Sequence, residues 1–277
     1  MATLKNVRIA FLGAGNMAEA MIAGLLREGL TQADHIRITD LVPERRDFMA
    51  QTYQVGIAES NTQAVASSDV VILAVKPQGM GELLAEVQTA AAHQPLFISI
   101  AAGITVSFLE KTLPAQARVI RCMPNTPALI GAGMTAICAG HAATAQDLIL
   151  AENILAATGQ VVRVEEAQMD AVTAVSGSGP AYAFYLMEAM IDAAERMGLD
   201  PELARTLVKQ TVSGAAALAH APDAADPSEL RQRVTSKGGT TAAAIAAMDA
   251  ENVRDHLITA ILAAQERARE LAAELER

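Results

Sequence analysis

The stretch VRIAFLGAGNMAEAMIAG, from Val7 to Gly24, decides how the first part of this chain folds. Its first half is an apolar run broken only by Arg8, which is typical of a strand buried on both faces of a parallel sheet. A glycine-rich turn follows, and apolar residues then recur with helical spacing through Met21 and Leu26. Strand, tight turn and helix is the order in which a G-x-G-x-x-(G/A) sequence binds a dinucleotide.

The small residues of this turn have separate physical roles. Gly13 permits the tight turn, Gly15 lets a pyrophosphate approach the backbone, and Ala18 lets the helix pack closely on the strand. The N–H groups at the start of the helix then face the phosphates, and the helix dipole favours their charge. The alternative is a plain glycine turn between a strand and a helix.

The composition limits the classes of function. The 277 residues suffice for one large domain or two ordinary ones, and the net charge of −10 argues against a nucleic-acid-binding surface. The two cysteines, Cys122 and Cys138, are flanked by apolar residues and are expected to be buried free thiols. With neither a signal peptide nor an apolar run long enough to cross a membrane, we expect a cytoplasmic protein without a membrane partner.

An acidic residue follows the second predicted strand, which covers residues 35–39. Asp40 lies 22 residues after Ala18, where a carboxylate usually binds the adenosine ribose 2′-OH and repels a 2′-phosphate. Arg45 and Arg46 can offset this repulsion, or they are solvated charges at the start of a helix. Further strands are predicted at residues 55–58, 69–75, 95–101, 119–122, 131–139 and 160–164.

Two more segments lie where ligands are expected, beyond the carboxyl ends of strands. Lys76 follows the strand at 69–75 and can face phosphate or ribose, although a surface lysine is the alternative. Residues 123–127 form a loop whose two prolines exclude a helix and hold Asn125 in a fixed place. An ordinary turn is the other interpretation of this loop.

The pattern changes at residue 165, after which there is almost no strand signal. We therefore expect an α/β fold in which residues 1–164 form a doubly wound, Rossmann-type dinucleotide-binding domain and residues 165–277 a helical domain. The sequence SGSGP at 176–180 is predicted to interrupt the helices. The helix predicted at 181–197 is apolar on most sides, so burying it requires a second subunit.

A second chemically distinctive stretch is TSKGGTT, from Thr235 to Thr241. Glycines, hydroxyls and a following helix start form a cradle suited to an anion such as a substrate carboxylate, although such loops are often only turns. The five histidines are scattered, and we expect no metal site.

Six motifs in order, GAGNMA, AVKPQ, SIAAGIT, RCMPNTPALIGAGMT, AVSGSGPAYAF and VTSKGGTT, resemble those of pyrroline-5-carboxylate reductase. The resemblance implies an oxidoreductase that reduces Δ1-pyrroline-5-carboxylate to L-proline with NADPH or NADH, the last step of proline biosynthesis. It also implies a C-terminal helical domain that forms a homodimer, with dimers assembling into decamers.

The resemblance also assigns site residues. It implies that Thr241 hydrogen-bonds the ring nitrogen of the substrate and is the catalytic residue. The substrate carboxylate would be bound by Ser236, Gly238, Gly239 and Thr240, which together with Thr241 form the substrate-binding residues. The cofactor would be bound by Gly13, Gly15, Asn16, Met17, Asn61, Lys76, Ala102, Asn125 and Pro127, in addition to Asp40.

Two residues depart from the family pattern. Lys237 stands where the family usually has proline; it adds attraction for a carboxylate or points to solvent. Asp40 stands where many members have a small polar residue that tolerates a 2′-phosphate, which favours NADH over NADPH.

Two other functions fit the residues. A reductase of pyrroline-2-carboxylate or piperideine-2-carboxylate would deliver hydride to the carbon that bears the carboxylate, and an assay of both imine isomers distinguishes it. A non-catalytic NAD-sensing oligomer would show no turnover.

Overall fold

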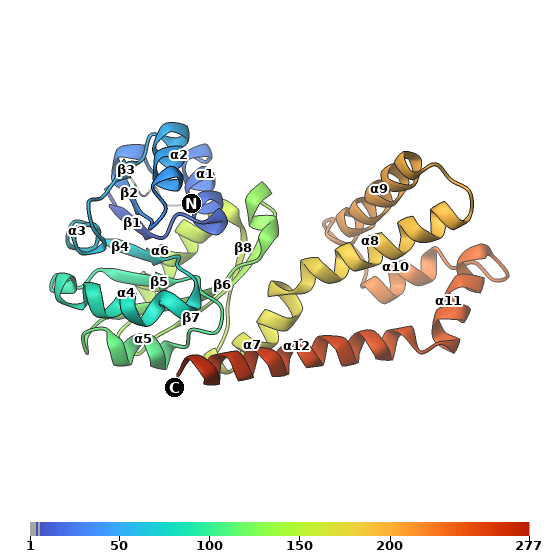
Figure 1. Cartoon of the computed structure of the whole chain (residues 1–277). Coiled ribbons are helices and arrows are strands. Elements are labelled where there is room, and N and C mark those ends of the chain that lie inside the picture. Colours follow the sequence, from blue (N-terminus) through green and yellow to red (C-terminus); the bar gives the residue numbers. More distant parts are fainter. Residues whose placement is uncertain (1–3, 5, 277) are drawn as a thin grey trace. The chain divides into compact units, whose positions relative to one another are not determined.

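The computed structural model describes residue 4 and residues 6–276, and its contacts divide the chain into two compact units (Figure 1). The first unit runs to Ser178 and includes the C-terminal end from Ala264, and the second unit is Gly179–Ala263. The predicted domain boundary at 164/165 follows the last strand instead, and it stays a prediction.

In the described residues, the first unit is built on an eight-stranded sheet in the order β3-β2-β1-β4-β5-β6-β7-β8. All neighbours are parallel except β6 and β7. On either side of β1 the chain winds in opposite directions, which creates the crevice where doubly wound sheets bind ligands. The strands are β1 (Ile9–Leu12), β2 (Ile36–Thr39), β3 (Gly56–Ile57), β4 (Val70–Leu73), β5 (Leu96–Ser99), β6 (Arg118–Met123), β7 (Gly133–Ala139) and β8 (Gly159–Arg163).

Helices cover both faces of the sheet because the strands are apolar on both sides (Figure 1). Ile9 and Phe11 of β1 belong to one buried cluster, while Ala10 and Leu12 belong to another. The first cluster is closed by α1 (Asn16–Arg27), α2 (Pro43–Tyr53) and α6 (Ala145–Leu155), and the second by α3 (Asn61–Ala66), α4 (Met80–Val87) and α5 (Val106–Thr112). This arrangement confirms the predicted Rossmann-type doubly wound fold.

The predicted interruption at 176–180 takes the form of a π-type turn and a bend at Ser178 rather than an open loop. The helix α7 (Met169–Val172) continues into a π-type turn, Thr173–Gly177, in which the N–H of Ser178 donates to the carbonyl of Thr173 at 2.8 Å. The next helix begins at Gly179, so Pro180 lies in its first turn, where a missing N–H costs no hydrogen bond.

The two-proline loop also differs from the prediction. Residues Thr126–Ile130 form a 3₁₀ turn with Pro127 in its first turn, because proline is tolerated at a helix start. Other 3₁₀ turns are Ala33–His35, Pro77–Gly79, Gln88–Ala91, Ala156–Thr158 and Glu166–Gln168.

The second unit is helical throughout and has little core of its own. Within residues 179–263 the buried apolar side chains are only Ala194, Ala204 and Val208. Phe184 is 56% exposed and Leu186 is 50% exposed, as expected of a helix that needs a second subunit to cover it. The helices are α8 (Gly179–Arg196), α9 (Pro201–Ala219), α10 (Pro227–Arg233), α11 (Thr240–Ala250) and the first part of α12 (Val253–Leu275).

The end of α12 packs within the first unit. Leu275 joins the apolar cluster beneath α4 and α5, and the hydroxyl of Thr105 donates to Glu276 Oε1 at 2.6 Å. None of the helices in the described part of the chain combines the length and apolar character needed to cross a bilayer.

Candidate active site

The predicted cofactor residues of the first unit follow the carboxyl ends of parallel strands. Gly13 follows β1, Asp40 follows β2, Lys76 lies beyond β4, Ala102 lies beyond β5 and Asn125 lies beyond β6. These five strands are parallel and stand side by side in the order β2-β1-β4-β5-β6. The structure therefore brings the five residues to one edge of the sheet.

The glycine turn fits a dinucleotide. Gly13 has φ of +99°, and a Cβ there would lie 2.6 Å from the carbonyl oxygen of Ala74, so only glycine suits this position. A Cβ on Gly15 would meet nothing within 4 Å, which leaves open space beside the backbone. Gly15 is the N-cap of α1 and no side chain caps the helix, so the N–H groups of its first turn, which includes Asn16 and Met17, can bind a pyrophosphate.

The carboxylate of Asp40 holds the glycine turn from one side. Its Oδ2 accepts a hydrogen bond from the N–H of Ala14 at 2.8 Å, and its Oδ1 accepts one from the N–H of Val42 at 2.9 Å. The carboxylate therefore lies beside the turn, at the position where the sequence predicts a contact with ribose.

Arg45 holds the same turn from the other side, a contact that the sequence did not reveal. Its Nε donates to the carbonyl of Ala14 at 2.5 Å, and its guanidinium pairs with Glu19 of α1. The other oxygen of Glu19 accepts from the hydroxyl of Tyr53 at 2.8 Å. Burial raises the pKa of Glu19, but hydrogen bonds from Arg45 and Tyr53 outweigh this and hold the pKa below its ordinary value.

Asn61 is held at the edge of the sheet by two side-chain hydrogen bonds, whereas Lys76 is exposed. Asn61 Oδ1 accepts from the hydroxyl of Thr39 at 2.6 Å, and its Nδ2 donates to Glu86 at 2.9 Å. Lys76 precedes the turn Pro77–Gly79 as its N-cap, with its side chain in solvent. A mobile cation at this edge is suited to a phosphate or ribose.

Asn125 is fixed by hydrogen bonds on both sides of its amide. Its Nδ2 donates to the carbonyl of Ser176 at 3.1 Å, and its Oδ1 accepts from the N–H of Met134 at 2.9 Å. Pro127 is half-buried in the turn that follows, and Ala102 is exposed beyond β5. These two hydrogen bonds hold the Asn125 side chain in one orientation at the edge of the sheet.

The second unit contains the predicted substrate loop. Gly238 has φ of +74°, and the N–H of Gly239 donates to the carbonyl of Ser236 at 3.0 Å. Gly239 is the N-cap of α11 and no side chain caps that helix, so the N–H groups at Thr240 and Thr241 are free to bind an anion. The side chain of Lys237 is exposed.

Two family models match this chain. Residues 166–271 match the model for pyrroline-5-carboxylate reductase dimerisation, and residues 8–103 match the model for NADP oxidoreductase coenzyme F420-dependent. The pyrroline-5-carboxylate reductase of Pseudomonas aeruginosa is 45% identical over 273 residues, which cover 98% of this chain and 99% of that protein. The chain belongs to the pyrroline-5-carboxylate reductase family.

Solved structures with similar folds agree with membership of the pyrroline-5-carboxylate reductase family. The pyrroline-5-carboxylate reductase of Coxiella burnetii has a TM-score of 0.90 and 39% identity, covering 96% of this chain and 99% of that chain. The pyrroline carboxylate reductase of Plasmodium falciparum, solved with NADP bound, has a TM-score of 0.87 and 26% identity, covering 97% and 99%.

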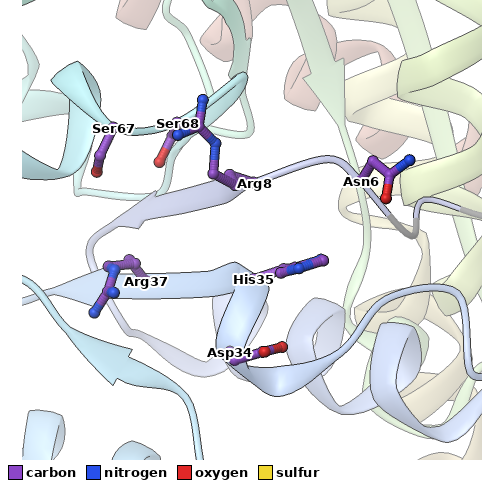
Figure 2. A pocket seen from close by; sticks show the side chains of 7 residues that line it. All are labelled: Asn6, Arg8, Asp34, His35, Arg37, Ser67 and Ser68. Carbon is purple, nitrogen blue, oxygen red and sulfur yellow. The ribbon is translucent and has the colours of Figure 1, made fainter.

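Other features of this reductase lie outside the candidate site. A hollow of about 360 Å³ lies near the amino ends of β1 and β2, at the opposite edge of the sheet (Figure 2). Figure 2 shows Arg8 and Arg37 pointing in different directions there, so the charged groups do not converge. As predicted, Cys122 and Cys138 are buried free thiols, and burial raises the pKa of Cys138 to about 12, which leaves it unreactive.

Proposed function

We propose that this chain reduces Δ1-pyrroline-5-carboxylate to L-proline with NADH or NADPH, the last step of proline biosynthesis. Family membership over nearly the whole length of the chain carries this conclusion. The open glycine turn at the carboxyl ends of β1 and β2 supports it, because the reaction needs a bound nicotinamide dinucleotide.

The first unit binds and orients the dinucleotide, which supplies a hydride when bound. The N–H groups that follow Gly15 bind the pyrophosphate, and Asp40 faces the adenosine ribose. Asn125 and Pro127 form a rigid surface on the nicotinamide side, with Ala102 near it. Asn61 and Lys76 contact the nucleotide.

The loop of the second unit binds the substrate. Ser236, Gly238, Gly239 and Thr240 surround the carboxylate, the uncapped N–H groups at the start of α11 bind it, and the dipole of α11 favours its charge. A protonated cyclic imine is already a strong electrophile, so the protein needs to position it rather than to supply a strong acid. The Thr241 hydroxyl donates a hydrogen bond to the ring nitrogen.

The assembly follows from the exposed helices of the second unit. Residues 165–277 form a dimerisation domain, in which the apolar side chains of α8 are covered by a second copy of the chain. We propose that these dimers assemble further into decamers, as the family resemblance implies. Two buried free thiols and the biosynthetic role support a cytoplasmic location.

The experiment that tests this function is steady-state reduction of Δ1-pyrroline-5-carboxylate with NADH and NADPH in parallel. We expect turnover with both cofactors and a higher kcat/KM with NADH, because Asp40 repels the 2′-phosphate. Turnover confined to pyrroline-2-carboxylate or piperideine-2-carboxylate would contradict the proposed substrate. Binding of NADH without turnover of any of these imines would contradict the enzymatic role.

A further inference from the structure

Arg45, a cation that contacts the glycine turn, is neutralised by a neighbouring carboxylate. Arg45 donates to the carbonyl of Ala14, and Asp40 accepts from the N–H of Ala14, so Arg45 and Asp40 contact the same residue of the turn. The side chains of Arg45 and Glu19 are each 24% exposed, and they form an ion pair. A pair that is only partly exposed is screened less by salt than a surface pair.

The contacts of Glu19 fix the carboxylate in place. One oxygen accepts from Arg45 and the other from the hydroxyl of Tyr53, so α1 is joined to both ends of α2. The Cζ of Arg45 also lies 5.1 Å from the ring centroid of Phe48, which limits the directions that the guanidinium can take.

The formal charges beside the glycine turn decide whether a 2′-phosphate is attracted or repelled. Asp40 and Glu19 are negative and Arg45 is positive, so these three groups carry a net charge of −1. A phosphate monoester adds a charge of about −1.5 to −2 at neutral pH. NADPH therefore meets a repulsive site, whereas NADH brings only a hydroxyl that Asp40 can bind.

We propose that Glu19 is a positioning residue that sets cofactor preference, by holding and neutralising Arg45 so that it cannot act as a ligand for the 2′-phosphate. This inference rests on the proposed use of a nicotinamide dinucleotide. Removing the charge of Glu19 leaves the positive charge of Arg45 to balance Asp40, and the repulsion of NADPH is lost. Glu19 acts through Arg45, with which it pairs, rather than as a ligand of the cofactor.

The test is calorimetric titration of the full-length protein with NADPH and with NADH, which needs no turnover. In Glu19→Gln we expect NADPH to bind about tenfold more tightly relative to NADH than in the wild type, the scale expected of one partly exposed charge. The gain should shrink as the NaCl concentration rises, because it is electrostatic. It should disappear in Glu19→Gln combined with Arg45→Ala.

Three control variants separate charge from structure. Glu28→Gln removes the same charge at the far end of α1, and it should leave the ratio of the NADPH affinity to the NADH affinity unchanged. Tyr53→Phe removes a hydrogen bond to Glu19 but leaves its charge, and it should also leave the ratio unchanged. Arg46→Ala in the Glu19→Gln protein should retain the gain, because the neighbouring arginine is not the cation released.

The possible results separate this inference from the proposed function. An unchanged ratio in Glu19→Gln, or an equal loss of both affinities, would overturn the role of Glu19 while leaving the reductase function intact. A shift in Tyr53→Phe as large as that in Glu19→Gln would also overturn it, because the effect would then be structural. If Glu19→Gln does not fold, Glu19→Ala provides the same comparison. Failure of the wild type to bind either dinucleotide would instead reject the proposed function.

Discussion

Thr241 is the proposed catalytic residue, and its substitution tests whether chemistry can be separated from cofactor binding. It stands in the first turn of α11, next to N–H groups that no side chain caps. We expect Thr241→Ala to lower kcat about 10²-fold, because a hydrogen-bond donor at the reacting ring nitrogen is lost. The Kd for NADH should be unchanged, and Thr241→Ser should retain most of the activity. A kcat of Thr241→Ala within twofold of the wild type would remove Thr241 from the mechanism.

At the scale of single residues, the sequence predicted the strand-end positions but not their contacts. Gly13, Gly15 and Asp40 could be assigned because a fixed spacing along one strand–turn–helix unit positions them. The pairing of Glu19 with Arg45 could not, because it joins two helices and residues 26 positions apart. A charged residue in a helix is usually solvated, and no periodicity distinguishes the few that pair across elements.

The start of α6 offers a test at the scale of an element. The hydroxyl of Thr144 accepts from the N–H of Asp147 at 3.2 Å, and Asp147 accepts from the N–H of Thr144 at 2.8 Å, which completes a capping box. We expect Thr144→Ala to destabilise the protein by about 1 kcal/mol, since this cap is lost. Thermal melting at a fixed protein concentration measures it, with Thr144→Ser as the control that keeps the hydroxyl. Equal melting temperatures for the wild type and Thr144→Ala would contradict the role of the cap.

The strands of the sheet were easier to predict than the helices α7 and α8, which follow the last strand. Buried strands such as β4 are continuous apolar runs, and a helix or turn signal follows each. The sequence SGSGP was interpreted as a break because glycine and proline usually end helices. The α-helix does break there, but through a hydrogen-bonded π-type turn at Thr173–Gly177 and a bend at Ser178 rather than through an open loop. Glycine and proline patterns locate such a break but do not distinguish these two forms.

At the scale of the whole molecule, the two units differ in how they bury apolar surface. The first unit encloses large apolar clusters on both faces of its sheet, whereas the second buries three small side chains. Helices with so little core gain their stability from association. The sequence indicated this, because the helix at 181–197 is apolar on most sides. It could not indicate which residues meet, since they lie on separate copies of the chain.

The dependence of the second unit on a second copy leads to a prediction about α8. Phe184 is 56% exposed in the single chain, and covering that exposed part contributes about 1–1.5 kcal/mol per subunit. Phe184→Asp would place an unpaired carboxylate in that contact, which costs more than the lost burial alone. We expect this variant to dissociate in sedimentation velocity experiments and to melt at a lower temperature.

Ile149→Asp is the matched control, since Ile149 is 51% exposed and belongs to α6 of the first unit rather than to α8. It should sediment as the wild type does, because an exposed isoleucine on the Rossmann-type unit has no partner to lose. Dissociation of both variants would indicate that the effect of Phe184→Asp is not specific to α8. Dissociation of neither would mean that other helices of the second unit cover each other. Dissociation of Phe184→Asp alone would show that the enzyme assembles by covering apolar side chains that the second unit does not bury within a single chain.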